Sequence, residues 1–245
     1  MTNHYCDMQN ADVILTIGSN NVENHPVSSK WVQRALDNGA TWIVVDPRYT
    51  RSAEMADIYC PIRSGTDIAF YGGLFNYILE HDLWQHEYVL NYTNASYLLD
   101  EEYSFDVETG IFSGFDKDSA TYDAKTWHYQ VESTKEWDTS EGGAYAWAKA
   151  EGVPEFTPPT VEVPKRDMTL QDPMCVFQQM KKHYSRYDLD TVSATCGMDK
   201  ELLEKVYATY AATGAPDKSG TILYALGQTQ HTYGAQNCRS MGILQ

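Results

Sequence analysis

Three short polar runs in this sequence contain residue types that bind nucleotides, and each run follows an apolar one. In the first, residues 18–26, Gly18 lets the backbone approach a ligand closely. The amides of Asn20 and Asn24 can donate hydrogen bonds to phosphate or ribose oxygens. Pro26 suits the first turn of a following helix, whose N-terminus would face an anion. This run therefore predicts a loop that binds phosphate or ribose.

The other two runs add carboxylates and arginines to the predicted site. Asp46 and Arg48 follow the second apolar run, and Arg51 comes close behind. A carboxylate there can accept hydrogen bonds from ribose hydroxyls, and arginines offset the charge of a pyrophosphate. The third run, residues 63–67, ends in Asp67, an acceptor-only side chain that suits the N1–H and N2–H groups of a guanine.

Two of these runs also have a purely structural interpretation. Residues 46–48 are typical of a turn with a surface ion pair, and residues 65–67 are typical of a helix N-cap. Found together at three strand ends of one sheet, the runs favour a nucleotide site. NAD is not the expected nucleotide, because Gly18 lacks the second and third glycines of G-x-G-x-x-G. The amide-rich run 228–231 could hydrogen-bond a heterocycle or cap the next helix.

The elements that must position these runs alternate between strands and helices. Apolar, β-rich runs predict strands over residues 13–17, 42–45, 58–62 and 221–226. Helices are predicted over residues 28–36, 68–79 (capped by residues 66 and 67), 173–184, 200–212 and 236–245. This alternation predicts an α/β fold with a doubly wound, mostly parallel sheet of Rossmann-like type. Ligands of such sheets bind outside the carboxyl ends of the strands, where the polar runs fall.

An acidic insertion interrupts this pattern. Residues 100–164 hold fifteen Asp or Glu and four Lys, and so carry −11 of the net charge of −16. Glycine and proline pairs predict loops and short hairpins, which form either a partner-facing surface or a packed excursion. Aromatic residues argue against disorder: Trp127, Tyr129, Trp137, Tyr145 and Trp147. We expect an α/β half over residues 1–99, the insertion over 100–168, and the rest of the α/β domain over 169–245.

Composition and missing motifs exclude several classes of protein. The net charge of −16 argues against a nucleic-acid binder, which needs a basic face. No stretch approaches about 18 consecutive apolar residues, so no direct membrane span is expected. The five cysteines form no C-x-x-C pair, and no H-E-x-x-H, G-x-S-x-G or P-loop motif occurs. We therefore predict neither a metal ligand nor a catalytic residue in this chain. Its end lies within a helical pattern without a capping signal, which predicts a segment of a larger protein.

The order and spacing of the runs resemble the large subunit of molybdenum- or tungsten-dependent formate dehydrogenase, in the dimethyl-sulfoxide-reductase superfamily. The resemblance extends over nearly the whole chain. It is carried by residues 1–4, 10–12, 18–26, 46–48, 63–69, 92–96, 183–187, 224–231 and 234–237. The acidic insertion resembles that of the selenocysteine-type enzymes.

This resemblance implies part of a site for molybdopterin guanine dinucleotide, two of which would hold the molybdenum or tungsten of the parent subunit. It implies that the phosphate and ribose are bound by Gly18, Asn20, Glu23 and Asn24, and that the ribose also lies near Asp46 and Arg48. It places Gly65 and Asp67 at the guanine. Near a pterin it places Leu226, Gly227 and Gln230. The parent would oxidise formate to carbon dioxide, with electrons leaving through a [4Fe–4S] cluster.

The same resemblance puts the catalytic groups outside this chain. The selenocysteine or cysteine metal ligand with its adjacent histidine, and the cluster cysteines, are expected upstream, and the arginine that orients formate is expected beyond Gln245. An iron–sulfur electron-transfer subunit is the expected partner. The expected location is the periplasm, with the cytoplasm as the alternative. Two other functions remain open: another molybdopterin oxidoreductase, of nitrate or thiosulfate reductase type, and a non-catalytic nucleotide-binding domain.

Overall fold

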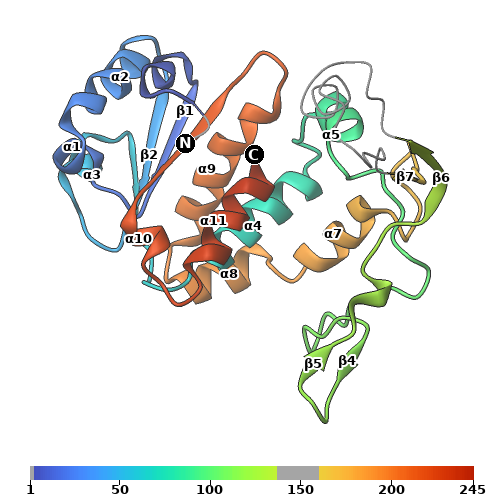
Figure 1. Cartoon of the computed structure of the whole chain (residues 1–245). Helices are drawn as coiled ribbons and strands as arrows, with labels where there is room; N and C mark the ends of the chain where they lie inside the picture. Colours follow the sequence, from blue (N-terminus) through green and yellow to red (C-terminus); the bar gives the residue numbers. More distant parts are fainter. Residues whose placement is uncertain (1–2, 137–159) are drawn as a thin grey trace, which may run out of the picture. The chain divides into compact units, whose positions relative to one another are not determined.

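The computed structural model describes residues 3–136 and 160–245 (Figure 1). The chain forms two compact units. Unit 1 comprises residues 1–86 and 183–245, and unit 2 comprises residues 87–182. All of the predicted nucleotide-binding runs belong to unit 1.

Unit 1 contains a four-stranded parallel sheet with the strand order β3-β2-β1-β8. The strands are β1 (Val13–Ile17), β2 (Thr41–Val45), β3 (Ile58–Cys60) and β8 (Gly220–Tyr224). The register pairs Ile17 with both Val45 and Tyr224, and Val45 with Cys60, so all four strands end at the same edge. The predicted parallel α/β sheet is thereby confirmed.

Two strands are shorter than the sequence predicts, and each stops for a local reason. β3 stops at Cys60 because Pro61 has no backbone N–H to continue the ladder. β8 stops at Tyr224 because the chain turns into a short helix, α10 (Leu226–Thr229). The expectation that the strand reaches Leu226 is therefore wrong, since Leu226 lies in this helix.

Helices cover both faces of the sheet, as Figure 1 shows. One face carries η1 (Tyr5–Asn10), α1 (Asn21–Asn24), α2 (Pro26–Asp37) and α3 (Arg51–Met55). The other carries α4 (Asp67–Glu80), α8 (Leu189–Cys196), α9 (Lys200–Ala211) with the turn η3 (Ala212–Gly214), and α11 (Gly234–Leu244). The long helices match the predicted ones, and Pro26 stands in the first turn of α2 as expected. The short helices α1, α3 and α8 are not predicted, because their lengths give little periodicity.

The capping prediction for α4 is wrong. Thr66 precedes the helix, but its hydroxyl donates to the carbonyl of Arg63 (2.7 Å) and caps no N–H group. α8 and α9 do begin with capping carboxylates, those of Asp188 and Asp199.

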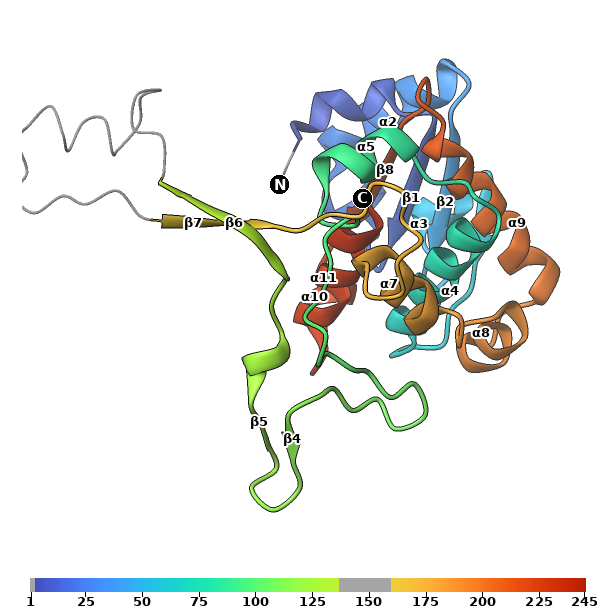
Figure 2. The same cartoon turned by 90° about the vertical axis from the view of Figure 1, so that its right-hand side faces the viewer.

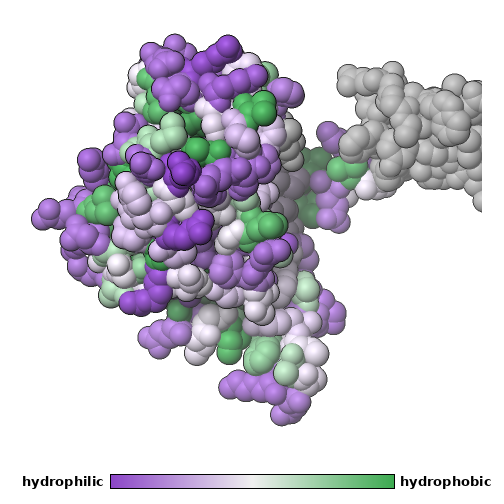
Figure 3. Space-filling model, turned by 90° about the vertical axis from the view of Figure 1, so that its left-hand side faces the viewer, coloured by the Kyte–Doolittle hydropathy of each residue, from purple (hydrophilic) through white to green (hydrophobic). Residues whose placement is uncertain are grey.

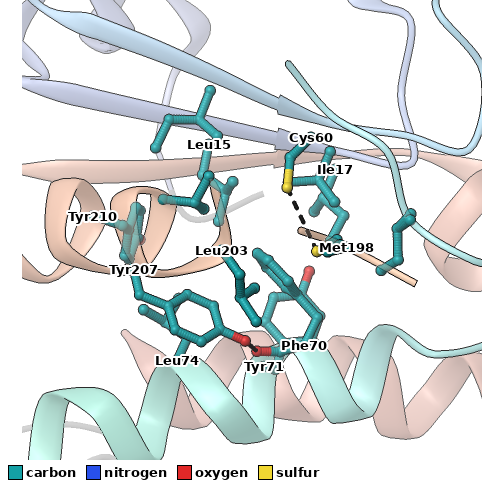
Figure 4. Close-up of a cluster of buried hydrophobic side chains, with 14 of the residues drawn as sticks. Leu15, Ile17, Cys60, Phe70, Tyr71, Leu74, Met198, Leu203, Tyr207 and Tyr210 are labelled. Atoms are coloured by element: carbon teal, nitrogen blue, oxygen red, sulfur yellow. Dashed lines mark hydrogen bonds between the residues drawn. The ribbon is translucent and has the colours of Figure 1, made fainter. Parts of the chain in front are cut away.

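The strands alternate their side chains between two buried clusters. Leu15 and Ile17 of β1 point toward Phe70 and Leu74 of α4, as Figure 4 shows. Ile14, in the same strand, belongs to the cluster on the opposite face. Because both faces are covered, the strands are apolar along their whole length rather than at every second residue.

Polar groups inside this core are paired with one another. The Trp42 indole N–H donates to the Thr16 hydroxyl (2.9 Å), which joins β2 to β1. The Tyr207 hydroxyl of α9 donates to the Phe70 carbonyl of α4 (2.6 Å). Burial raises the pKa of the Cys60 thiol to about 12, so this cysteine is a buried neutral group.

Unit 2 contains most of α5 (His86–Tyr92) and of α7 (Val176–Tyr184), together with two antiparallel hairpins. The hairpins pair β4 (Phe115–Asp116) with β5 (Thr121–Tyr122), followed by the turn η2 (Ala124–Thr126), and β6 (Val131–Glu136) with β7 (Thr160–Pro164). Figure 2 shows the β4–β5 hairpin at the end of an extended arm of this unit. The predicted loops and short hairpins are therefore present. Trp137, Tyr145 and Trp147 lie outside the described residues.

Aromatic side chains hold the β4–β5 arm together. The ring of Phe112 lies 4.7 Å from that of Phe105 and 5.6 Å from that of Trp127, between centroids. The Trp127 indole N–H donates to the Ser113 carbonyl (3.0 Å). The aromatic residues of this part of the insertion thus pack against one another.

The surface of unit 1 is mostly polar on the side that Figure 3 shows, where hydrophobic residues form small separate patches. Across residues 3–136 and 160–245, no helix combines the length and the apolar character that crossing a bilayer requires.

We expect Thr16→Val to lower the free energy of unfolding by about 1–3 kcal/mol, because it leaves the buried Trp42 indole N–H without its acceptor. Urea denaturation measures this cost. The same substitution in a Trp42→Phe background removes no hydrogen bond and should cost much less. An equal cost in both backgrounds would show that the bond contributes nothing.

Candidate nucleotide site at the carboxyl edge of the sheet

Four loops leave the sheet side by side, because its four parallel strands end in register. They begin after Ile17, Val45, Cys60 and Tyr224. The strand order reverses between β1 and β8: the chain moves from β1 outward to β2 and β3, and later adds β8 on the other side. In open α/β sheets, the crevice at such a reversal is where ligands bind.

Gly18 and Gly227 meet at this reversal. The N–H of Gly227 donates to the Gly18 carbonyl (3.1 Å), and Gly18 has a φ of +59°. A Cβ at Gly18 would lie 2.9 Å from the carbonyl carbon of Gly227 and 3.1 Å from the side-chain nitrogen of Gln228. The sequence suggested that Gly18 makes room for a ligand. In the structure, the space beside its Cα is taken by the chain after β8.

Asp67 lies at the same place, in the first turn of α4, and is buried. One of its carboxylate oxygens, Oδ1, accepts a hydrogen bond from Nε2 of Gln228 (2.6 Å). Oε1 of Gln228 accepts from the Tyr71 hydroxyl (3.3 Å), one turn further along α4. The structure therefore brings Gly18, Asp67 and Gly227 together, and joins them through Gln228.

Sequence reasoning left the role of the run 228–231 open between hydrogen-bonding a heterocycle and capping a helix. The side chain of Gln228, the first residue of this run, is fully buried and bonds to Asp67 and Tyr71. The only signal for this arrangement was the cluster of amide side chains after an apolar strand.

Two further contacts join the loop after β8 to the loop before α4. The Tyr233 hydroxyl donates to the Gly65 carbonyl (2.7 Å), and Gly65 has a φ of +86°. Nε2 of His231 lies 2.8 Å from the Gly227 carbonyl and 4.0 Å from the second carboxylate oxygen of Asp67. The His231 and Tyr233 rings stack with their centroids 5.5 Å apart. Gly65 and Asp67 are thus held from the β8 side.

A second polar group surrounds Asn20, on the β2 side of β1. Its Oδ1 accepts from the Ser52 hydroxyl of α3 (3.0 Å), and its amide donates to Glu23. Glu23 in turn pairs with Arg51, with 3.2 Å between Oε1 and Nε. The neighbouring Asn21 is buried and also bonds to Ser52. Asn20 and Glu23 therefore lie together, with α3 as an anchor that the sequence did not indicate.

The other predicted residues of the first and second loops lie near the surface. Asn24 is exposed, and its Oδ1 lies 2.8 Å from the His25 imidazole. Asp46 accepts from the backbone N–H of Arg48 (2.8 Å), in a turn like the one that the structural interpretation expected. Burial raises the pKa of Asp46, and the neighbouring Arg48 opposes that rise. The Arg48 side chain is exposed.

Leu226 and Gln230 face solvent at the two ends of α10, with 61% of Leu226 exposed. Arg63 turns away from the site, because its guanidinium donates to the Thr195 carbonyl (2.8 Å) at the C-terminus of α8. Within the described residues, no group of three or more His, Cys, Asp or Glu side chains is arranged to hold a metal ion.

Two buried side-chain atoms near the edge have no hydrogen-bond partner within the part of the chain that the structure describes. One is the amide nitrogen of Asn21, a donor, and the other is the amide oxygen of Asn237, an acceptor. Buried polar atoms are nearly always paired, so each of these needs an explanation. A bound ligand with acceptors on the Asn21 side and donors on the Asn237 side would satisfy both.

Comparison with known proteins shows what this chain is similar to. Residues 1–83, which contain three of the four loops, match the family described as molybdopterin oxidoreductase.

The chain is also similar along its whole length to large subunits of formate dehydrogenases. It is 51% identical over 245 residues to the formate dehydrogenase subunit alpha of Megalodesulfovibrio gigas. It is 45% identical to the formate dehydrogenase 2 subunit alpha (cytochrome c-553) of Nitratidesulfovibrio vulgaris, and 45% to the nitrate-inducible formate dehydrogenase major subunit of Escherichia coli. These matches cover 100% of this chain and 21% of each relative, so the chain spans about a fifth of their length.

The fold also matches a solved structure, that of acetylene hydratase from Pelobacter acetylenicus. The TM-score is 0.55 with 22% sequence identity, over 96% of this chain and 21% of that one. At this identity the likeness concerns the fold alone.

We expect Gly18→Ala to be more destabilising than Gly39→Ala. Both glycines have positive φ, which costs a side-chain-bearing residue roughly 1–2 kcal/mol. A Cβ at Gly39 would meet nothing within 4 Å, whereas one at Gly18 would meet Gly227 and Gln228. Overpacking should add about 1–3 kcal/mol at Gly18 only. Urea denaturation measures both variants, and equal losses of unfolding free energy would contradict the close approach.

Proposed function

We propose that this chain is part of the catalytic subunit of a formate dehydrogenase, which oxidises formate to carbon dioxide at a molybdenum or tungsten centre. The observation that carries the proposal is the 51% identity with a formate dehydrogenase subunit alpha over all 245 residues. Within that subunit, the role of this chain is to bind one of two molybdopterin guanine dinucleotides. When bound, the metal–pterin centre supplies the two-electron redox chemistry.

The residues at the sheet edge fit such a dinucleotide. The unpaired donor of Asn21 suits a phosphate or ribose oxygen, and the unpaired acceptor of Asn237 suits an N–H group of a heterocycle. Both lie in loops or helices that start at the reversal of strand order, where nucleotides bind in this class of sheet.

Each side of the edge has its own part in binding. On the β2 side, we assign Gly18, Asn20, Glu23 and Asn24 to the phosphate and ribose, and Asp46 and Arg48 to the ribose. On the β8 side, we assign Gly65 and Asp67 to the guanine, and Leu226, Gly227 and Gln230 to a pterin. Glu23 and Asp46 suit ribose hydroxyls, because carboxylates only accept hydrogen bonds, while the exposed guanidinium of Arg48 suits the pyrophosphate charge.

Access to Asp67 depends on His231. Asp67 is buried, and its second oxygen lies 4.0 Å from the His231 imidazole, whose side chain is 27% exposed. Movement of this partly exposed histidine would give a guanine access to the carboxylate.

The metal ligand, the [4Fe–4S] ligands and the arginine that orients formate are assigned to other parts of the parent polypeptide. An iron–sulfur electron-transfer subunit is the proposed partner, and the periplasm is the proposed location. Fractionation of cells that express the parent protein tests the location, and a cytoplasmic result would favour the alternative.

The proposal as a whole is tested on the purified parent polypeptide. We expect molybdenum or tungsten by elemental analysis, GMP after acid hydrolysis of the dinucleotide, and formate-dependent dye reduction. Growth without molybdate and tungstate should abolish that reduction. Protein without pterin or metal would overturn the proposal. Metal and pterin without formate oxidation would favour another molybdopterin oxidoreductase, and a guanine nucleotide without metal would favour a nucleotide-binding domain.

We expect Asp67→Asn in the parent polypeptide to weaken retention of the guanine dinucleotide by about 1.5–3 kcal/mol. The variant replaces a charged acceptor by a neutral amide, so the base loses a charge-assisted hydrogen bond. After incubation and desalting, acid hydrolysis of the protein yields GMP from the dinucleotide that is still bound. The amount of GMP per metal atom measures the loss. Asp217→Asn, at an exposed position, is the matched control. Equal GMP content in both variants would count against the guanine assignment.

A further inference from the structure

Gln228 is a fully buried glutamine, and both ends of its side-chain amide are bonded. Nε2 donates to the Asp67 carboxylate at 2.6 Å, and Oε1 accepts from the Tyr71 hydroxyl at 3.3 Å. Asp67 and Tyr71 lie four residues apart on α4 and so present one face of the helix. The glutamine therefore bridges successive turns of this helix.

The orientation of this amide is determined by its two partners. A carboxylate accepts hydrogen bonds only, so the NH₂ group must face Asp67. Burial and the nearby Asp67 charge raise the pKa of the Tyr71 hydroxyl well above its ordinary value, so Tyr71 remains a neutral donor toward Oε1. A flipped amide would set its oxygen against the carboxylate and its NH₂ against the hydroxyl hydrogen.

The backbone of Gln228 is held as well. Its carbonyl accepts from the Asn237 side chain of α11 (3.0 Å), and its N–H donates to the Ala225 carbonyl (3.0 Å). On the remaining side, a Cβ at Gly18 would lie 3.1 Å from Nε2. The amide is thus confined by α4 and by Gly18, while α11 holds the backbone of Gln228, and the bonded amide leaves the Asp67 carboxylate little freedom to rotate.

We propose that Gln228 is a positioning residue that fixes the Asp67 carboxylate for the guanine base. This inference rests on the function proposed above, and it concerns a residue to which that function gives no contact with the ligand. Gln228 satisfies one oxygen of Asp67 with a neutral donor. The second oxygen, on the His231 side, is the one that receives the base.

The test uses the parent polypeptide with its cofactor bound, and it compares Gln228→Met, Gln228→Glu and the control Gln236→Met. Methionine has a similar volume to glutamine but removes both hydrogen bonds. Gln236 is exposed on α11, so its substitution controls for a change of residue type. After incubation at fixed temperature and desalting, the dinucleotide still bound is measured as GMP formed on acid hydrolysis. Its decrease with time gives the rate of dinucleotide loss, and the melting temperature is recorded for each variant.

We expect Gln228→Met to lose the dinucleotide roughly tenfold or more faster than wild type, because a hydrogen bond to a charged group is removed. Gln236→Met should match wild type. If Gln228 had a purely structural role, Gln228→Met would melt at a lower temperature but would lose the dinucleotide at the wild-type rate. That outcome would overturn the inference.

Gln228→Glu gives a second readout that packing alone would not produce. At neutral pH, two carboxylates would face each other, and dinucleotide loss should be fast. As the pH falls, the pair takes up one shared proton, the glutamic acid donates to Asp67 again, and retention should recover. His231, Tyr71 and Cys196 are the other titratable groups near Asp67, and they are present unchanged in Gln228→Met, which should show no such recovery. The same pH profile in both variants would overturn the inference.

The two proposals fail in different ways. Wild-type protein that yields no GMP on acid hydrolysis contradicts the proposed function. Protein in which Asp67→Asn loses the dinucleotide, but both Gln228 variants retain it at neutral pH, contradicts only the role of Gln228.

Discussion

The close approach of Gly18 and Gly227 is the constraint on which the carboxyl edge of the sheet depends. A backbone hydrogen bond of 3.1 Å joins the chain after β1 to the chain after β8, at a separation that a Cβ on either residue would prevent. Gly227 is followed by Gln228, so this approach also delivers the glutamine to α4 and to Asp67. A backbone contact between two glycines thereby decides which side chains meet at the reversal of strand order.

The strands and long helices could be predicted from the sequence because their signals are local. The run from Val13 to Ile17 is apolar throughout, and only a strand covered on both faces is buried in this way. The aligned strand ends followed from the parallel sheet, and so did the expectation that residues 18, 46 and 67 share one edge. The ends of β3 and β8 were less predictable, because apolar residues continue past the point where the ladder stops.

The contact between Asp67 and Gln228 could not be predicted, because 161 residues separate the two positions. Their meeting depends on β8 lying beside β1 and on α4 passing beneath that pair, and neither follows from periodicity. The same reason explains why the sequence did not indicate the contact of Gly18 with Gly227, since its positive φ and lack of a side chain accommodate a distant part of the chain. The contact of Arg63 was equally unpredictable, because its guanidinium donates to the Thr195 carbonyl at the end of α8, 132 residues along the chain.

The glycine contact and the buried carboxylate at this edge depend on each other, because the contact brings the Gln228 amide to Asp67. Burying Asp67 removes water from a charge, which is costly unless other groups compensate. The N-terminus of α4 and the amide of Gln228 provide that compensation without a positive side chain on the bonded oxygen. An arginine there would have neutralised the carboxylate and left it a weaker acceptor. A dipole and an amide instead preserve its charge in surroundings of low dielectric constant, where a hydrogen bond to a further donor is strongest. The glycine contact is therefore as much a part of the site as the carboxylate, since without it the amide could not reach Asp67.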